Sequence, residues 1–140
     1  MFLLDTNVII TILRGDGKGF LDRMLKGRRE IYQISAITVF ELETGIQKAH
    51  ASGISAKKLE EKIKLLTYLK SHIRTAYFGD AEAMEAAKVR TELEKDGQGI
   101  GPMDTLLAGT ARAHDWTLVT ANTHEFLRVK DLKLESWADS

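Results

Sequence analysis

The sequence contains no cysteine, which excludes disulfides and thiolate metal sites and fits a reducing cytosol. It lacks any apolar run near the roughly 18 residues that cross a membrane, and its first residues lack the basic start and apolar core of an export signal. Its net charge is zero, with Lys+Arg and Asp+Glu both at 20, whereas a protein that holds nucleic acid by bulk charge is usually basic. We therefore expect a single domain over residues 1–140, without a membrane segment and located in the cytoplasm.

Short apolar runs alternate with longer segments of helical periodicity along the chain. The apolar runs predict strands at 2–4, 31–34, 73–77, 118–120 and 132–135. Apolar spacing, capping residues and glycines predict helices at 7–13, 21–25, 39–49, 56–70, 81–95 and 103–114, with Asp80 as an N-cap and Pro102 opening the last helix. Strands separated by helices are typical of βαβ units. The predicted fold class is α/β, with a central, mostly parallel sheet of four to five strands flanked by helices.

The most informative segment is the first, where four apolar residues run directly into Asp5, Thr6 and Asn7. The carboxyl end of a strand in an open α/β sheet faces the ligand crevice, where Asp5 would be a metal-binding or catalytic carboxylate. The alternative is that Asp5 caps the following helix, because Asp, Thr and Asn are all good N-cap residues. This segment alone leaves both interpretations open.

Further acidic and amide side chains are expected at the same edge of the sheet. Glu41 follows the second predicted strand, Asp104 lies in the first turn of the last predicted helix, and Asn122 and Glu125 follow the fourth strand. Each has a local alternative. Thr38 and Glu41 form a capping-box pattern, Asp104 suits a helix dipole, and Asn122 suits a turn. Carboxylates gathered in one crevice repel each other unless a cation neutralises them, and their oxygen atoms favour Mg²⁺ or Mn²⁺.

Four blocks of the sequence resemble those of the PIN domain family, most closely its VapC branch, the ribonuclease half of toxin–antitoxin pairs. The blocks are LLDTN at 3–7, SAITVFEL at 35–42 with Gly45, IGPMDTLLA at 100–108 and TLVTANTHEF at 117–126, and the ending LKLESW at 132–137 is also similar. Any one block is weak, but four in order at this spacing in a chain of this length are specific. The resemblance implies a single PIN-like domain.

The resemblance assigns roles to particular residues. Asp5, Glu41 and Asp104 match the family's three acidic ligand positions for Mg²⁺ or Mn²⁺. The remaining matches are Thr6 and Asn7, which orient the first aspartate in the family, Thr120, which lines the site, and Asn122, the fourth catalytic position. The chain departs from the family pattern at Asn122, where many PIN domains have Asp, and Glu125 would then be the nearby acid. The number of metal ions is left open by this departure.

The implied activity is a metal-dependent endoribonuclease that leaves a 5′-phosphate, with a VapB-like antitoxin and homodimerisation as the implied partnerships. The apolar stripes of the helices at 39–49 and 56–69 would pack the core and form part of a groove for the antitoxin. The main alternative is a PIN-like binding module that no longer cleaves.

Other chemistries have weaker support. A metal-independent ribonuclease would need paired histidines, whereas His50, His72, His114 and His124 lie on scattered predicted elements. An aspartyl-phosphate phosphatase would need a second Asp at Asn7. The glycine-rich stretches at 15–19 and 97–101 match no phosphate-binding motif.

Overall fold

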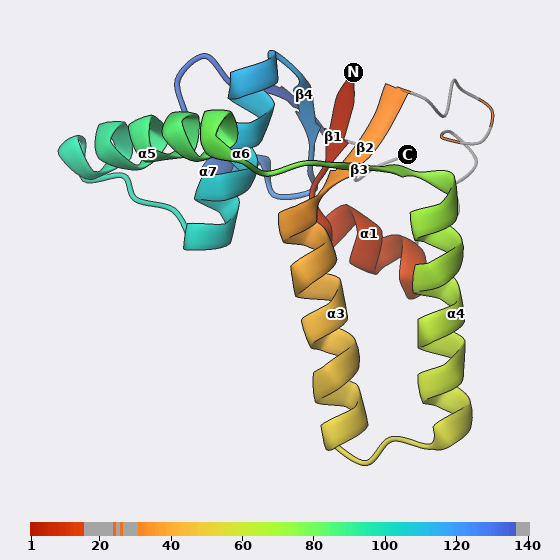
Figure 1. The fold of residues 1–140 in the computed structure, drawn as a ribbon. Helices are drawn as coiled ribbons and strands as arrows, with labels where there is room; N and C mark the ends of the chain where they lie inside the picture. The colour runs from red at the N-terminus through yellow and green to blue at the C-terminus, as the bar shows by residue number, and fades with distance from the viewer. Residues whose placement is uncertain (16–23, 25, 27–30, 137–140) are drawn as a thin grey trace.

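The computed structural model describes residues 1–15, 24, 26 and 31–136 and is built around a parallel sheet (Figure 1). Within these residues the sheet has five strands in the order β3-β2-β1-β4-β5, and every neighbouring pair is parallel. The strands are β1 (Phe2–Leu4), β2 (Tyr32–Ser35), β3 (Arg74–Ala76), β4 (Thr117–Val119) and β5 (Lys133–Glu135). The predicted α/β class and parallel sheet are confirmed. Apart from Met24, the helix predicted at 21–25 lies outside the described residues.

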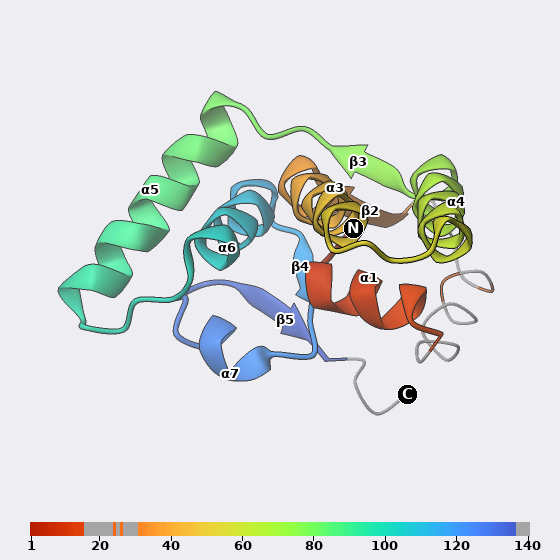
Figure 2. The same ribbon diagram turned by 90° about the horizontal axis from the view of Figure 1, so that it is seen from below.

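Helices cover both faces of this sheet (Figure 2). They are α1 (Thr6–Leu13), α3 (Ala36–Ala51), α4 (Ala56–His72), α5 (Asp80–Lys95), α6 (Pro102–His114) and α7 (Thr123–Phe126). Side chains alternate across a strand, so Leu4 packs in one core with α1, α3 and α4, whereas Leu3 packs in the other with α5, α6 and α7. Both leucines are fully buried, and burial of each contributes about 1.5–3 kcal/mol.

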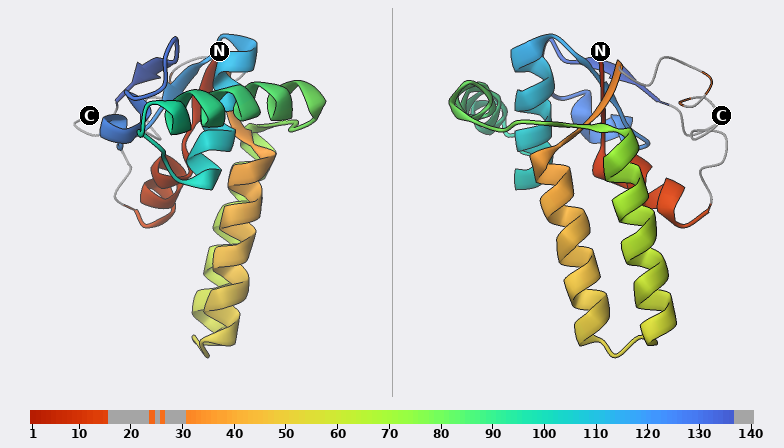
Figure 3. Two further views of the ribbon diagram at one scale, coloured as in Figure 1. Left: turned by 90° about the vertical axis from the view of Figure 1, so that its left-hand side faces the viewer. Right: turned by 45° about the vertical axis from the view of Figure 1, so that its right-hand side comes forward.

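Helices α3 and α4 form an antiparallel hairpin that extends beyond the sheet (Figure 3). The end nearer the sheet is anchored by Leu42, Leu66 and Leu69, which are buried in the same core as α1. The turn between the helices contains Gly53 at a φ of 80°, a conformation that glycine adopts without steric cost. The hairpin therefore presents much of its length to the surroundings rather than to the sheet.

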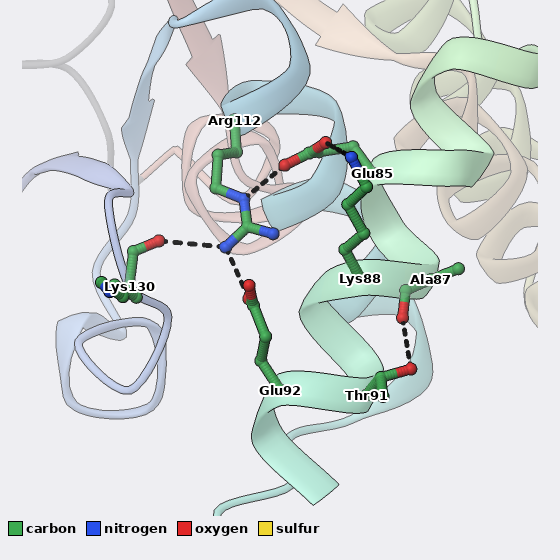
Figure 4. Close-up of polar contacts among 7 residues, drawn as sticks. All are labelled: Glu85, Ala87, Lys88, Thr91, Glu92, Arg112 and Lys130. Atoms are coloured by element: carbon green, nitrogen blue, oxygen red, sulfur yellow. Dashed lines mark hydrogen bonds and ion pairs between the residues drawn. The ribbon is translucent and has the colours of Figure 1, made fainter. Parts of the chain in front are cut away.

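On the opposite face of the sheet, α6 lies between α5 and the strands (Figure 2). Two kinds of contact hold α5 against α6. A Cβ atom on Gly109 would lie 2.4 Å from the Cα of Ala86, so only glycine permits this close helix contact. Arg112 supplies polar links, because its Nε donates to Glu85 at 2.7 Å and its Nη1 donates to Glu92 at 2.8 Å and to the carbonyl of Lys130 at 3.1 Å (Figure 4). Together these contacts hold α6 against α5, and the N-terminal end of α6 carries Asp104.

Two predicted helix starts are wrong. Helix α3 begins at Ala36 rather than at residue 39, because the Ser35 hydroxyl caps it by accepting a hydrogen bond from the amide of Ile37 at 3.0 Å. Helix α5 is capped at Gly79 instead of Asp80, and the amide of Gly79 donates to the Glu82 carboxylate at 2.7 Å. In the part of the chain that the structure describes, no helix is long and apolar enough to span a bilayer.

Candidate active site

The candidate site lies at the edge of the sheet where three adjacent strands, β2, β1 and β4, end within one residue of the same level. Leu4, the last residue of β1, pairs with Ile34 in β2 and with Val119 in β4. The chain therefore leaves the sheet at neighbouring points, and the amide of Asp5 still donates to the carbonyl of Val119 at 2.8 Å. Helix α6 runs back along the sheet toward β4, which brings its N-terminal end to the same edge. This topology gathers side chains that lie far apart in sequence.

Asp5 is held inside this edge, with an exposed fraction of 2%. It occupies the N-cap position of α1, but its side chain makes no capping hydrogen bond, and its Oδ2 accepts instead from the Thr120 hydroxyl at 2.8 Å. Burial raises the pKa of Asp5, the Thr120 hydrogen bond and the backbone amides of Thr6 and Asn7 oppose that rise, and the Glu41 charge adds to it. The carboxylate is therefore fixed by Thr120, the residue that follows β4, and it also lies near the first backbone amides of α1.

Glu41 comes to the edge from the second turn of α3, because that helix begins at Ala36. One carboxylate oxygen, Oε1, accepts a hydrogen bond of 2.7 Å from the Thr6 hydroxyl. The Thr6 hydroxyl also lies 3.0 Å from the hydroxyl of Thr38. The capping-box interpretation of Thr38 and Glu41 is thus wrong, since Ser35 is the N-cap. The hydroxyl of Thr6 thus donates to Glu41, while the backbone amide of Thr6 interacts with the Asp5 carboxylate.

Asp104 lies in the first turn of α6, after the N-cap Gly101 and Pro102. The pKa of Asp104 is raised to about 6 by burial first of all, together with the charges of Asp5, Glu125 and Glu41 and a hydrogen bond with Glu125. Three acids from separate segments of the chain therefore act on this one carboxyl group. The predicted gathering of carboxylates at the sheet edge is present in the structure.

The segment after β4 contributes in two ways. The amide of Asn122 donates to the Thr120 hydroxyl at 2.9 Å, which fixes the oxygen that in turn holds Asp5. Asn122 is also the N-cap residue of α7, although its side chain makes no capping hydrogen bond. The sequence analysis missed α7, a helix of four residues, and this short helix is what carries Glu125 to Asp104.

The edge is anionic and has no paired cation in the described part of the chain. None of the ion pairs there includes Asp5, Glu41, Asp104 or Glu125. The same described residues contain no group of three acidic, histidine or cysteine side chains already arranged to hold a metal ion. The carboxylates at this edge supply oxygen donors of the kind that suits Mg²⁺ or Mn²⁺, but their side chains are not arranged around a common metal position.

Two of the four histidines, His72 and His114, have partners away from the acidic edge. The His114 imidazole hydrogen-bonds to Glu82 at 2.7 Å, at the end of α6 opposite Asp104. His72 stacks on Tyr68 with ring centroids 4.1 Å apart, on α4. Each of these two imidazoles is therefore engaged away from the acidic edge.

An apolar groove of about 220 Å³ adjoins the edge between α1, α3 and α4. Its lining is mostly aliphatic with a few charged side chains, and comprises Ile10, Leu13, Arg14, Glu41, Leu42, Gly45, Ile46, Lys62, Leu65 and Leu66. Glu41 is thus shared between the groove and the acidic edge. Leu65 is 46% exposed although it is a large apolar residue.

Comparison with known proteins places these features in a family. The PIN domain model matches residues 2–132. The chain is 33% identical over 138 residues to ribonuclease VapC2 of Rickettsia felis and 30% identical over 137 residues to a tRNA(fMet)-specific endonuclease VapC of Shigella flexneri, with 98% of both chains covered in each case.

Solved structures agree with this placement. VapBC2 from Rickettsia felis, bound to a DNA fragment from its promoter, superposes with a TM-score of 0.83 at 31% identity, covering 97% of this chain and 98% of that chain. DNA-bound VapBC from Salmonella typhimurium superposes with a TM-score of 0.86 at 27% identity, covering 97% of each chain. The parallel sheet with its acidic carboxyl edge, the family match and these relatives agree: the chain belongs to the PIN domain family, in its VapC branch.

Proposed function

We propose that this protein is a Mg²⁺- or Mn²⁺-dependent endoribonuclease and the toxin of a VapBC-type toxin–antitoxin pair. The observation that carries the proposal is the gathering of carboxylates at the sheet edge, where burial raises the pKa of Asp104 and the charges of Asp5, Glu125 and Glu41 add to that increase. Such mutual repulsion is costly to a folded protein and is typical of sites that work with a cation or a proton. The VapC names of the relatives supply the reaction class.

Asp5, Glu41 and Asp104 would hold the metal ion, and Asn122 or Glu125 would complete the ligand set. A bound Mg²⁺ or Mn²⁺ would supply an activated water, neutralise the phosphate and stabilise the leaving oxygen. The Thr120 hydroxyl keeps Asp5 directed into the crevice by a hydrogen bond of 2.8 Å. Asp104 becomes ionised above a pH of about 6, so its carboxylate is available as a ligand at neutral pH.

Glu41 has a second task in this proposal. Its side chain is partly exposed, whereas Asp5 is almost completely buried. One oxygen accepts the hydrogen bond from Thr6, which leaves the carboxylate able to accept a proton from water at the edge. An imported cation also explains how a chain with zero net charge could bind RNA, because the positive charge is local.

The groove beside Glu41 is the proposed seat of a VapB-like antitoxin. An amphipathic helix lays its apolar face in such a groove, and the aliphatic lining with Leu65 half-exposed suits that mode. Relatives of this chain have been solved as VapBC complexes. A partner in this groove would lie against Glu41, so it could cover the acidic edge as well. Homodimerisation and a cytoplasmic location stay predictions, and sedimentation analysis of the free protein tests the first.

The test compares two glutamates on the same helix. Glu41→Gln removes the charge at the edge, whereas Glu43→Gln removes the charge of an exposed residue that pairs with Lys70 at 3.7 Å. With Mg²⁺ and a substrate panel of tRNA, rRNA and mRNA, we expect Glu41→Gln to lose cleavage and Glu43→Gln to retain it. Fragments from the active protein should carry 5′-phosphates.

Antitoxin binding separates the enzyme from a binding module. An enzyme loses cleavage in Glu41→Gln and still binds antitoxin, because the aliphatic lining of the groove is intact. A wild-type protein that binds antitoxin and cleaves no RNA in the panel would contradict the nuclease and favour the binding module.

A further inference from the structure

Thr38 differs from five other helical threonines in the direction of its hydroxyl, because it lies in the first turn of α3, where the residue four positions earlier, Ile34, belongs to β2. The usual arrangement is a hydrogen bond from the threonine hydroxyl to the carbonyl four residues earlier. That arrangement is adopted by Thr11, Thr67, Thr91, Thr105 and Thr110. The hydroxyl of Thr38 is directed out of α3 instead, to within 3.0 Å of the Thr6 hydroxyl, and the residue is completely buried.

The direction of this contact follows from counting protons. A threonine hydroxyl has one proton to donate, and Thr6 donates it to Glu41 Oε1 at 2.7 Å. In the contact between the two hydroxyls Thr38 must therefore be the donor and Thr6 the acceptor. The result is a one-way chain from Thr38 through Thr6 to the carboxylate. In such a chain each bond polarises and strengthens the next.

The helix geometry explains how two helices share this chain. Thr38 and Glu41 are three residues apart on α3, a spacing that places both on one face of a helix. Thr6 is the first residue of α1 and approaches that face from β1. Because Thr38 is completely buried, water does not replace its hydroxyl as a donor to Thr6. The Thr38 hydroxyl is therefore the group that donates to the Thr6 hydroxyl and orients it.

We propose that Thr38 is a positioning residue that acts through Thr6 to hold the Glu41 carboxylate in one orientation at the acidic edge. Groups that orient metal-binding side chains typically change metal affinity or activity by about 10–100-fold when they are removed. This role rests on the proposed function only in so far as Glu41 binds a metal there. The orientation of Glu41 in the metal-free protein is a consequence of the chain itself.

Four variants test the proposal. Thr38→Val removes the hydroxyl with little change of shape, and Thr38→Ser keeps it. Thr110→Val is the matched control, because Thr110 is equally buried and its hydroxyl bonds only to the carbonyl of Leu106. Thr38→Ala is the second hydroxyl-free variant in case the valine form does not fold, and circular dichroism and thermal melting establish the fold of each.

The first readout needs no metal. Side-chain scalar couplings of Glu41, measured by NMR in EDTA, should report a single χ1 rotamer in the wild type, Thr38→Ser and Thr110→Val, and averaging between rotamers in Thr38→Val or Thr38→Ala. The second readout is Mn²⁺ affinity by calorimetry without RNA. We expect it to fall about tenfold or more in the hydroxyl-free variants and to stay within about twofold in Thr38→Ser and Thr110→Val.

The two readouts separate this inference from the proposed function. A fixed Glu41 rotamer in a folded Thr38→Val or Thr38→Ala protein overturns the positioning role, whatever the protein cleaves. Equal losses of Mn²⁺ affinity in Thr38→Val and Thr110→Val also overturn it, because both would then reflect general destabilisation. Rotamer averaging in a protein whose wild type binds no Mn²⁺ supports the positioning role and contradicts the metal-dependent nuclease.

Discussion

Asp104→Asn should stabilise the metal-free protein at neutral pH although it removes a residue of the proposed site. In the folded protein burial and the charges of Asp5, Glu125 and Glu41 raise the pKa of Asp104 from 3.8 to about 6. A group whose pKa is higher in the folded state favours folding while it is protonated, and that contribution is lost as the pH rises through the folded pKa. Asparagine stays neutral at every pH, so its folded state never carries this repulsion.

The size of the effect follows from the shift. About two pKa units correspond to at most about 3 kcal/mol, at about 1.4 kcal/mol per unit. Asp104 is only partly buried, and solvent screening reduces the figure. We expect Asp104→Asn to raise the free energy of unfolding by about 1–2 kcal/mol above a pH of about 6 and by much less near a pH of about 4.

The assay is urea denaturation in EDTA, followed by circular dichroism at several pH values between about 4 and about 7.5. The matched control is Asp96→Asn, an exposed aspartate at the C-terminal end of α5, which should change the unfolding free energy by less than about 0.5 kcal/mol. A destabilised Asp104→Asn protein, or a difference from the wild type that does not grow with pH, would refute the electrostatic reasoning.

Two further predictions concern packing and partner binding. Gly109→Ala should lower the free energy of unfolding by about 1–3 kcal/mol, because its Cβ would meet Ala86 at 2.4 Å. Gly45→Ala, with open space around its Cβ, should raise the free energy of unfolding by about 0.5–1 kcal/mol. Urea denaturation measures both variants, and equal effects would contradict the close helix contact. Leu65→Lys should weaken antitoxin binding by about tenfold or more in calorimetry and leave the melting temperature nearly unchanged, because this groove residue is 46% exposed. Met84→Lys, a 65% exposed site on α5, is its control, and equal losses in both variants would place the antitoxin elsewhere.

The parallel sheet could be predicted because β1 and β4 are short, mostly apolar runs followed by polar residues, and helical segments separate the strands. The same pattern placed Asp5 at a strand end, and the topology of a crossover helix placed Asp104 beside it. The charge coupling among Asp5, Glu41, Asp104 and Glu125 is therefore a consequence of features that are readable along the chain.

The features that could not be predicted are those for which the sequence offers two or more local structures of similar stability. Both Ser35 and Thr38 are good N-cap residues, and the hydrogen bond from Ile37 to Ser35 decides between them only in the folded chain. The role of the Thr38 hydroxyl then depends on Thr6, which approaches from another helix. Helix α7 is only four residues long, too short for a periodic pattern, so the route of Glu125 to Asp104 could not be predicted.

The most direct measurement is cleavage of total RNA by the purified, partner-free protein, with Mg²⁺ or Mn²⁺ and with EDTA, beside Asp104→Asn and Asp96→Asn. We predict cleavage that requires the metal ion, disappears in EDTA and in Asp104→Asn, and persists in Asp96→Asn. The stability assay shows whether Asp104→Asn is folded. A protein that is folded and inactive has lost its catalytic activity and not its structure. Cleavage that continues in EDTA, or that survives Asp104→Asn, would contradict a metal-dependent ribonuclease built on these carboxylates.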